Sequence, residues 1–261
     1  MNLQFTIITV CYNVKNTIEK TILSVINQTY PNIEYIIIDG GSTDGTLEII
    51  KKYSTQISYW CSEKDNGIFD AMNKGVNNSL NKNGFVNFLN AGDLFYSKDT
   101  IKKVAESIKH DSLYACGIAK YPNGRYWSPI SKYRINIKDI YKGGNVNHQS
   151  SFININLLKE ESYDTRYKII TDDLYFIKKV GIEKVKYQTI NLIISLYDNT
   201  GISNDINKSN FMIEERKLFI KEHNLNVSSN LSKNKIERFK EIILKLFQWP
   251  FIRIFIEKRS K

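Results

Sequence analysis

Short, continuous runs of apolar and β-branched residues constrain the fold of this chain more than any other feature. Phe5–Val10, Glu34–Ile38, Ile57–Cys61 and Phe85–Leu89 lack a regular polar–apolar alternation, which predicts strands buried on both faces. Between the first two runs, apolar residues recur at helical spacing in Ile18–Ile26. Strands that alternate with helices predict a mostly parallel central sheet flanked by helices, which is an α/β fold.

The remaining segments are consistent with one globular unit. Helices are also expected at about Thr46–Tyr53, Ile68–Leu80 and Asp172–Val180, and the chain is strand-like from about Leu113 to Ile155. From Lys208 the pattern is helical and polar. The length of 261 residues suits one large domain, or one domain with a modest appendage. A content of 42% hydrophobic and 25% charged residues excludes a disordered or collagen-like chain.

Polar residues follow the predicted strands directly. Tyr12 and Asn13 come after the first strand, Asp39 ends the second, and Asn90 and Asp93 follow the fourth. In parallel sheets of this kind, ligands bind beyond the carboxyl ends of the strands. Each cluster alone could serve as a cap or a turn, but their shared placement predicts a ligand site at one edge of the sheet.

The positive charge of the chain is concentrated at its C-terminal end. From residue 231 to residue 261 there are nine Lys or Arg residues and three Glu residues, so more than half of the net charge of +10 lies there. Lys235–Phe247 is amphipathic, and a cluster of Trp, Phe and Ile follows at Trp249–Ile256. This combination favours an interfacial membrane anchor over a nucleic-acid partner. A C-terminal helix that packs on the protein's own core is the alternative.

The cysteines and the N-terminus favour a reducing, cytosolic compartment. Cys11, Cys61 and Cys116 are scattered and odd in number, without the spacing of a zinc site or a disulfide framework. The first residues lack the pattern of a secretory signal, and no run reaches the roughly 18 apolar residues of a membrane span.

A series of polar motifs occurs along the chain in a definite order. The first motifs are Thr9-Val10-Cys11-Tyr12-Asn13, Gln28-Thr29-Tyr30, Ile38-Asp39-Gly40-Gly41-Ser42-Thr43-Asp44-Gly45-Thr46, the segment Ser62–Gly75, and Phe88-Leu89-Asn90-Ala91-Gly92-Asp93. The later ones are His148–Phe152, Tyr163–Lys168, Thr171-Asp172-Asp173 and Asp198–Ser203. Over about residues 4–203 the chain resembles the family 2 glycosyltransferases. The match is strongest to bacterial enzymes that build colanic-acid-like, O-antigen-like or capsule-type surface polysaccharides.

The resemblance implies a GT-A nucleotide-diphospho-sugar transferase fold with a C-terminal helical extension. Residues 1–205 would form the catalytic domain, with a nucleotide-binding half at 1–95 and an acceptor half at 96–205. Residues 206–261 would form a helical, basic segment that associates with the membrane.

The resemblance also implies an activity. The enzyme would be an inverting glycosyltransferase that moves a sugar from a nucleotide-diphosphate sugar, with UDP favoured, to a hydroxyl of a lipid-linked saccharide or an oligosaccharide. We expect it in the cytoplasm, peripheral on the inner face of the bacterial membrane, where its C-terminus would meet anionic lipid. No nucleic-acid partner is expected.

Residue roles carry over from the family position by position. Asp172 would be the catalytic base, and Asp93 would bind the divalent cation, Mg²⁺ or Mn²⁺. His148, Gln149 and Asp173 could contact the acceptor or the diphosphate. The residues expected to bind the nucleotide sugar are Thr9, Tyr12, Asn13, Asp39, Gly41, Ser42, Asp65, Asp70, Lys74, Asn90 and Ala91.

The sequence departs from the family pattern at three positions. The family commonly has Asp where this chain has Asn90, residue 92 is Gly, and many relatives carry Arg where this chain has Met72. The metal would then depend on Asp93 together with water and phosphate, and Lys74 could supply the cation near the diphosphate.

Three other functions are compatible with part of the pattern. A nucleotidyltransferase would need a glycine-rich basic loop after the first strand, where this chain has Tyr12-Asn13-Val14. A nucleic-acid-binding protein would distribute its charge along a groove. A catalytically silent relative that binds nucleotide sugars is the third alternative, because of Asn90 and Gly92.

Overall fold

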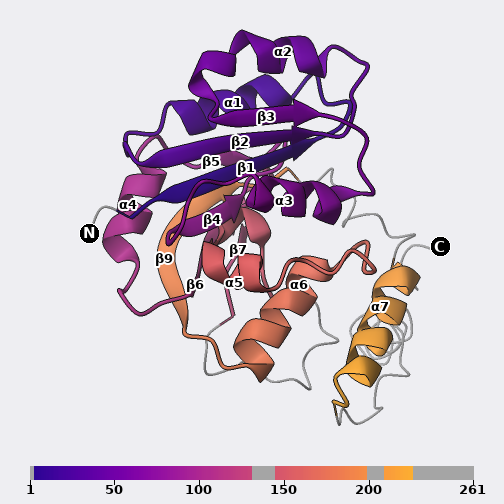
Figure 1. Ribbon diagram of the computed structural model, residues 1–261. Coiled ribbons are helices and arrows are strands. Elements are labelled where there is room, and N and C mark those ends of the chain that lie inside the picture. Colours follow the sequence, from indigo (N-terminus) through magenta and orange to yellow (C-terminus); the bar gives the residue numbers. More distant parts are fainter. Residues whose placement is uncertain (1–2, 131–144, 199–208, 226–261) are drawn as a thin grey trace, which may run out of the picture. The chain divides into compact units, whose positions relative to one another are not determined.

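The computed structural model describes residues 3–130, 145–198 and 209–225, which build a mixed β-sheet with helices on both faces (Figure 1). Its first half alternates strictly between strands and helices, which confirms the predicted order. The elements of this half are β1 (Phe5–Cys11), α1 (Ile18–Ile26), β2 (Ile33–Asp39), α2 (Thr46–Lys52), β3 (Tyr59–Ser62), α3 (Ile68–Asn77) and β4 (Phe85–Phe88).

The second half adds strands and short helices to the same sheet. They are β5 (Leu94–Phe95), α4 (Thr100–Ser107), β6 (Tyr114–Lys120), β7 (Tyr126–Trp127), β8 (Ser151–Asn154), α5 (Ile155–Glu160), α6 (Thr171–Phe176), β9 (Tyr187–Leu196) and α7 (Ser209–Glu222). The helix expected over residues 172–180 begins at Thr171, and its hydrogen bonding changes to a π-helical turn at Ile177–Ile182. The amphipathic segment Lys235–Phe247 and the cluster at Trp249–Ile256 lie outside the described residues.

The strand order is β3-β2-β1-β4-β8-β6-β9-β5, with β7 paired to β6. The strands of the first half, β3, β2, β1 and β4, are parallel neighbours, as predicted. β8 is antiparallel to both β4 and β6, β9 is parallel to β6, and β5 is antiparallel to β9. The sheet is therefore parallel over β3, β2, β1 and β4 and mixed over the remaining strands.

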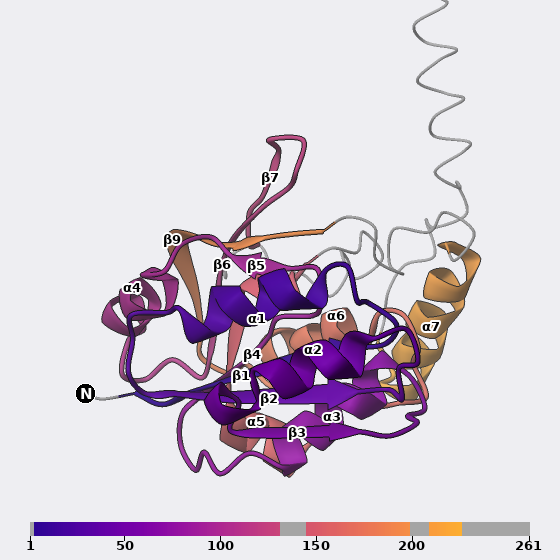
Figure 2. The ribbon, with the colours of Figure 1, turned by 90° about the horizontal axis from the view of Figure 1, so that it is seen from above.

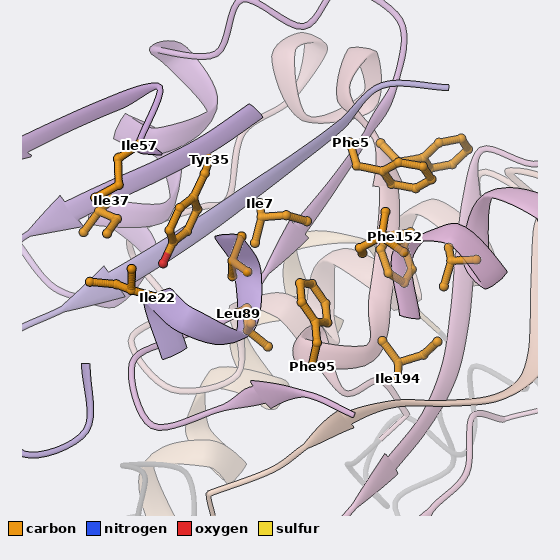
Figure 3. Close-up of a cluster of buried hydrophobic side chains, with 14 of the residues drawn as sticks. Phe5, Ile7, Ile22, Tyr35, Ile37, Ile57, Leu89, Phe95, Phe152 and Ile194 are labelled. Carbon is orange, nitrogen blue, oxygen red and sulfur yellow. The ribbon is translucent and has the colours of Figure 1, made fainter. Parts of the chain in front are cut away.

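The two faces of β1 pack against different helices. Phe5 and Ile7 point into a cluster with Tyr35 and Ile37 of β2, as Figure 3 shows, and α1, α2 and α4 contribute to this cluster. On the opposite face α3 lies so close that a Cβ atom on Gly75 would be 2.5 Å from Cγ2 of Ile8. Burial on both faces explains why β1 is a continuous apolar run.

Helix α7 contacts the segment that precedes α6. The carboxylate of Glu215 accepts hydrogen bonds from the backbone N–H groups of Lys168, Ile169 and Ile170. Arg216 lies 3.4 Å from the buried carboxylate of Asp173, in the first turn of α6. These bonds fix the start of α6. The predicted division at residues 205 and 206 remains a prediction. Within the described part of the chain, no helix has the length and apolarity needed to cross a membrane.

Removal of the Arg216 charge tests how strongly α7 stabilises the fold. Both partners of the Arg216–Asp173 pair are more than 90% buried, so Arg216→Met should leave an uncompensated buried carboxylate and lower the free energy of unfolding by about 3 kcal/mol. Urea denaturation measures this change. The matched control is Lys217→Met, because Lys217 forms an exposed pair with Glu214 and its loss should cost less than about 1 kcal/mol. Equal losses in the two variants would contradict the assignment.

Candidate active site

The register of the parallel strands sets polar residues in one row at the edge of the sheet. Cys11 of β1 pairs with Asp39 of β2, and Asp39 pairs with Ser62 of β3. The turn after β4 joins the same edge, because the N–H of Ala91 donates to the carbonyl of Val10 over 3.2 Å. The structure thus brings together the strand-end clusters that the sequence predicts.

Asp39 is fully buried and holds the glycine loop. Its carboxylate accepts hydrogen bonds from the N–H groups of Gly41 and Ser42, at 3.1 and 2.8 Å, and from the hydroxyls of Ser42 and Ser62. Burial alone would raise the pKa of Asp39, but these hydrogen bonds outweigh it and the net pKa is lowered. The carboxylate is therefore charged, and the donors that satisfy it belong to the chain itself.

Tyr12 and Asp65 face each other across Gly40. Tyr12 is 62% exposed. A Cβ atom on Gly40 would lie 2.7 Å from Oδ2 of Asp65 and 3.4 Å from Cδ2 of Tyr12. Only glycine allows this approach of an exposed aromatic ring and a carboxylate. A ring that can stack and an acid that can accept hydrogen bonds suit a base and a ribose.

Asn13 ties two loops together. It adopts a left-handed backbone with φ of 51°, its N–H donates to the Ser42 hydroxyl, and its Oδ1 accepts from the N–H of Thr43. Thr9 is completely buried, and its hydroxyl donates to the carbonyl of Leu89. Thr9 and Asn13 thus hold the turns of the edge in place, and the structure places Thr9 in the core.

Asp70 and Lys74 stabilise the loop that leads into α3. The carboxylate of Asp70 accepts from the N–H of Asn66 at 2.9 Å. The ammonium of Lys74 lies 2.8 Å from Glu63 and 3.8 Å from Asp70. The hydrogen bond with Glu63 is the main cause that raises the pKa of Lys74. Lys74 therefore brings a positive charge to this edge, next to the segment that carries Asp65.

His148 connects Asn90 to Asp172. Nδ2 of Asn90 lies 2.9 Å from Nε2 of His148, and Nδ1 of His148 lies 2.8 Å from Oδ2 of Asp172. The side chains of His148 and Asp172 are 19% and 16% exposed. This chain of hydrogen bonds joins the turn after β4 to the first turn of α6. The sequence predicted all three residues as candidates, but not their contact.

Several buried polar atoms have no hydrogen-bond partner within the protein, and Oδ1 of Asn90 is one of them. Among residues 3–130, 145–198 and 209–225, the buried side-chain atoms without a hydrogen-bond partner are Oδ1 of Asn87, Asn90 and Asn147, the hydroxyl of Tyr163, and Nε of Arg216. Asn87 donates hydrogen bonds to the backbone carbonyls of Gln149 and Ser151, and Asn147 is the residue before His148. Burial raises the pKa of Tyr163, and the charge of Asp172 raises it further. In native proteins such groups usually pair with protein atoms, ordered water or a bound ion.

Asp93 is buried between Gln149 and Asp198. Its oxygens accept hydrogen bonds of 2.8 Å from Nε2 of Gln149 and from the N–H of Asp198. Burial raises the pKa of Asp93 to about 7. Gly92, with φ of 106°, makes room for Asp198, since a Cβ atom there would lie 2.9 Å from Oδ2 of Asp198. Asp198 is the first residue of the Asp198–Ser203 motif, whose other residues lie outside the described ranges.

Asp173 occupies a different environment from Asp172. It is 5% exposed, and its carboxylate accepts from the N–H and Nδ2 of Asn145 and pairs with Arg216. Burial raises the pKa of Asp173. The structure thus separates the two adjacent acids, with Asp172 at His148 and Asp173 inside the protein.

The oxygens of Asp93 and Asn90 suit a divalent cation that takes most of its ligands from the bound substrate. Within the described ranges, no group of three or more His, Cys, Asp or Glu residues is arranged to hold a metal. Each oxygen of Asp93 accepts one hydrogen bond from within the chain and keeps a second lone pair, and Oδ1 of Asn90 has no partner. Mg²⁺ is typically bound by one or two carboxylates together with phosphate oxygens.

Known proteins resemble this chain in sequence and in structure. The chain is 28% identical over 217 residues to the PGL/p-HBAD biosynthesis glycosyltransferase of Mycobacterium bovis, which covers 80% of this chain and 82% of that protein. S. aureus TarS (1–349) in complex with UDP-GlcNAc is 20% identical with a TM-score of 0.65, over 87% of this chain and 68% of that chain. The mannosyltransferase PcManGT of Pyrobaculum calidifontis, in complex with GDP-Man and Mn²⁺, is 16% identical with a TM-score of 0.57, and the match covers 74% of this chain and 56% of that chain.

The two structures share the GT-A fold with this chain, which confirms the predicted fold. The chain spans about two thirds of the TarS chain. The family model described as "Glycosyl transferase family 2" matches residues 6–171, which is well over half of the sequence. The protein therefore belongs to glycosyl transferase family 2 and is a glycosyltransferase.

Proposed function

We propose that the protein transfers a sugar, with inversion, from a UDP-sugar to a hydroxyl of a lipid-linked saccharide in bacterial surface polysaccharide synthesis. The observation that carries this proposal is the hydrogen-bonded chain Asn90–His148–Asp172, which joins the strand edge to the acid on α6. Complexes of the structural neighbour TarS with UDP and UDP-GlcNAc support the choice of donor. A lipid-linked acceptor would hold the enzyme at the inner face of the cytoplasmic membrane.

The donor would bind along the edge of the parallel strands. Tyr12 would stack on the base, and Asp65 would accept hydrogen bonds from the ribose. Asp39 would shape the Gly41-Ser42 loop on which the nucleotide lies, because its carboxylate is engaged by that loop. Lys74 would add positive charge toward the diphosphate.

Transfer would be a single displacement at the anomeric carbon. A lone pair of the acceptor hydroxyl forms the new C–O bond while the bond to the diphosphate breaks, and the diphosphate leaves with that electron pair. Asp172 takes the proton of the acceptor hydroxyl, which is general-base catalysis. A divalent cation at Asp93, when bound, would neutralise charge on the departing diphosphate.

Replacement of Tyr12 tests the base site. Base stacking on an aromatic ring contributes about 1–3 kcal/mol, so Tyr12→Ala should weaken UDP binding roughly 5- to 150-fold in isothermal titration calorimetry. The ring is largely exposed, so the fold should tolerate the change. Tyr59→Ala is the control, since Tyr59 lies at the opposite end of β3 from Ser62. Wild-type affinity in Tyr12→Ala would refute this placement of the base.

Metal removal tests the role of Asp93. UDP with Mn²⁺ should raise the thermal midpoint more than UDP with EDTA, because a ligand that binds only the folded state stabilises it by mass action. Asp93→Asn should abolish this difference while it retains the smaller shift from UDP alone. A metal-dependent shift that persists in Asp93→Asn would assign the cation to other residues.

Asp172→Asn tests the base. The variant should bind UDP like the wild type, and its rate of sugar transfer should fall by roughly 10²–10⁴-fold, as expected when a general base is lost. Release of UDP from UDP-GlcNAc, with water or an oligosaccharide as acceptor, measures the rate. Transfer at the wild-type rate by Asp172→Asn would remove Asp172 from the mechanism.

A further inference from the structure

One face of the ribbon formed by β6, β7 and β9 carries a group of aromatic side chains. Ala119 of β6 pairs with Trp127 of β7 and with Ser195 of β9. Paired residues of neighbouring strands lie on the same face of a sheet, and side chains alternate between the faces along a strand. Trp127 therefore shares a face with Ser195, and so do Tyr121 and Tyr197, which lie two residues beyond Ala119 and Ser195. The rings of Tyr121 and Tyr197 pack edge to face with their centroids 5.3 Å apart, in agreement with this placement.

The same face of the ribbon is continuous with the candidate active site. The hydroxyl of Ser195 lies 2.7 Å from the hydroxyl of Ser150, and both residues are fully buried. At the end of β9, Tyr197 is followed by Asp198, whose N–H donates to the carboxylate of Asp93 over 2.8 Å. The aromatic face therefore begins next to Asp93 and extends away from it along the ribbon.

The hairpin that joins β6 to β7 has a hydrogen-bonded turn. The N–H of Tyr121 donates to the carbonyl of Arg125 over 2.8 Å, and the N–H of Gly124 donates to the carbonyl of Tyr121 over 3.0 Å. Gly124 has a φ of 81°, a left-handed conformation that favours glycine. Beyond β7, the carbonyl of Ile130 accepts a hydrogen bond from the hydroxyl of Tyr187. Figure 2 shows the hairpin extending away from the layer of α1 and α2, so its aromatic residues stand on an ordered support.

The opposite face of the same hairpin has a different chemistry. Lys120 pairs with Tyr126, and its ammonium lies 5.8 Å from the ring centroid of Tyr126 and 5.7 Å from that of Tyr96. A cation at this distance is attracted to the face of an aromatic ring, so a charge from within the chain already engages these two rings. Tyr121 and Tyr197 instead contact each other, and an edge-to-face pair covers at most one face of one ring.

We propose that Tyr121, Trp127 and Tyr197 bind the saccharide of the acceptor by stacking against the apolar faces of its sugar rings. The C–H groups on one face of a pyranose carry partial positive charge, and the face of an aromatic ring is negative. The tyrosine hydroxyls, and the guanidinium of Arg125 at the turn, can form hydrogen bonds with sugar hydroxyls. The proposal rests on the proposed function and names the residues that recognise its acceptor.

The position of the aromatic face favours a saccharide over a membrane surface as its ligand. Tyr and Trp also occur where proteins meet lipid headgroups. A lipid contact has no need to lie beside the transfer site, whereas the acceptor hydroxyl must reach it. Because the face is continuous with a residue that bonds to Asp93, a saccharide that lies on it can present its last sugar to the donor. Stacking on several rings would also orient that sugar, which is a requirement for transfer to one hydroxyl.

Binding of a saccharide to this face can be measured without any donor. The chain has three tryptophans, so protein labelled with 5-fluorotryptophan gives one ¹⁹F signal for each, and Trp127→Phe identifies the signal of Trp127. The probes are short neutral oligosaccharides built from glucose, galactose, mannose, N-acetylglucosamine or rhamnose. At least one of them should shift the signal of Trp127 and leave unchanged that of Trp60, which lies in β3. If none of them shifts the Trp127 signal, the proposal is overturned.

Matched variants on the two faces of the hairpin test the stacking by isothermal titration calorimetry. Trp127→Leu and Tyr121→Leu keep an apolar side chain but remove the ring. Each should raise the dissociation constant of the oligosaccharide that binds best by roughly fivefold or more, as expected for an aromatic residue at the centre of a contact. Trp127→Phe keeps a ring and should retain more of the affinity than Trp127→Leu. Tyr126→Leu is the control, because Tyr126 lies on the opposite face, and equal losses in Trp127→Leu and Tyr126→Leu would contradict the proposal.

Kinetics distinguishes a failure of this proposal from a failure of the proposed function. With UDP-GlcNAc as donor and the same oligosaccharide as acceptor, Trp127→Leu should raise the KM for the oligosaccharide and leave the KM for UDP-GlcNAc unchanged. If the wild type transfers sugar and Trp127→Leu keeps the wild-type KM for the oligosaccharide, only the stacking role fails. If the wild type binds the oligosaccharide at Trp127 but transfers no sugar to it from UDP-GlcNAc, the proposed function fails in its choice of substrates and the binding site stands.

Lipid vesicles test the membrane as the alternative ligand. Vesicles of phosphatidylglycerol and phosphatidylethanolamine carry no saccharide and should leave the ¹⁹F signal of Trp127 unchanged. A shift of that signal with vesicles, together with no shift from any oligosaccharide, would assign the face to the membrane and overturn the proposal. The thermal midpoint of each variant shows whether it is folded.

Discussion

The parallel pairing of β1 with β2 and β4 is the constraint on which the rest of the molecule depends. Because these strands run in one direction, their last residues lie at one edge, where Cys11 pairs with Asp39 and Asp39 with Ser62. Burial on both faces makes these strands largely apolar, and the polar residues of the candidate site follow at their ends. The buried charge of Asp39 is then stabilised by the loop that it organises.

Residues from the second half of the chain, which are distant in sequence, complete the site. His148 and Gln149 reach Asn90 and Asp93 across the junction of β4 and β8, where the sheet changes from parallel to antiparallel. Helix α7 stabilises the segment before α6 through Glu215, and so contributes to the position of Asp172. The catalytic constellation that we propose therefore depends on contacts between residues far apart in the sequence.

The sequence predicted the element order of the first half well, because β1, β2 and β4 are buried, largely apolar runs. The expectation of burial on both faces was wrong for β3, which is partly exposed. The second half was harder to predict. β5 has two residues, and β9 mixes polar and apolar positions, so both depend on long-range partners rather than on local pattern. For the site, residue types and motif order were sufficient to name Asn90, His148 and Asp172. Their contact, the internal bonding of Asp39 and the burial of Thr9 follow from tertiary packing, which periodicity does not encode.

Hydrogen–deuterium exchange with and without UDP and Mn²⁺ would test the central claim, that the nucleotide sugar binds at the edge of the parallel strands. Our account predicts added protection in three segments that are distant in sequence, at residues 11–13, 39–42 and 62–67, with β9 unchanged. Protection confined to other parts of the chain, in a protein that binds UDP, would contradict it.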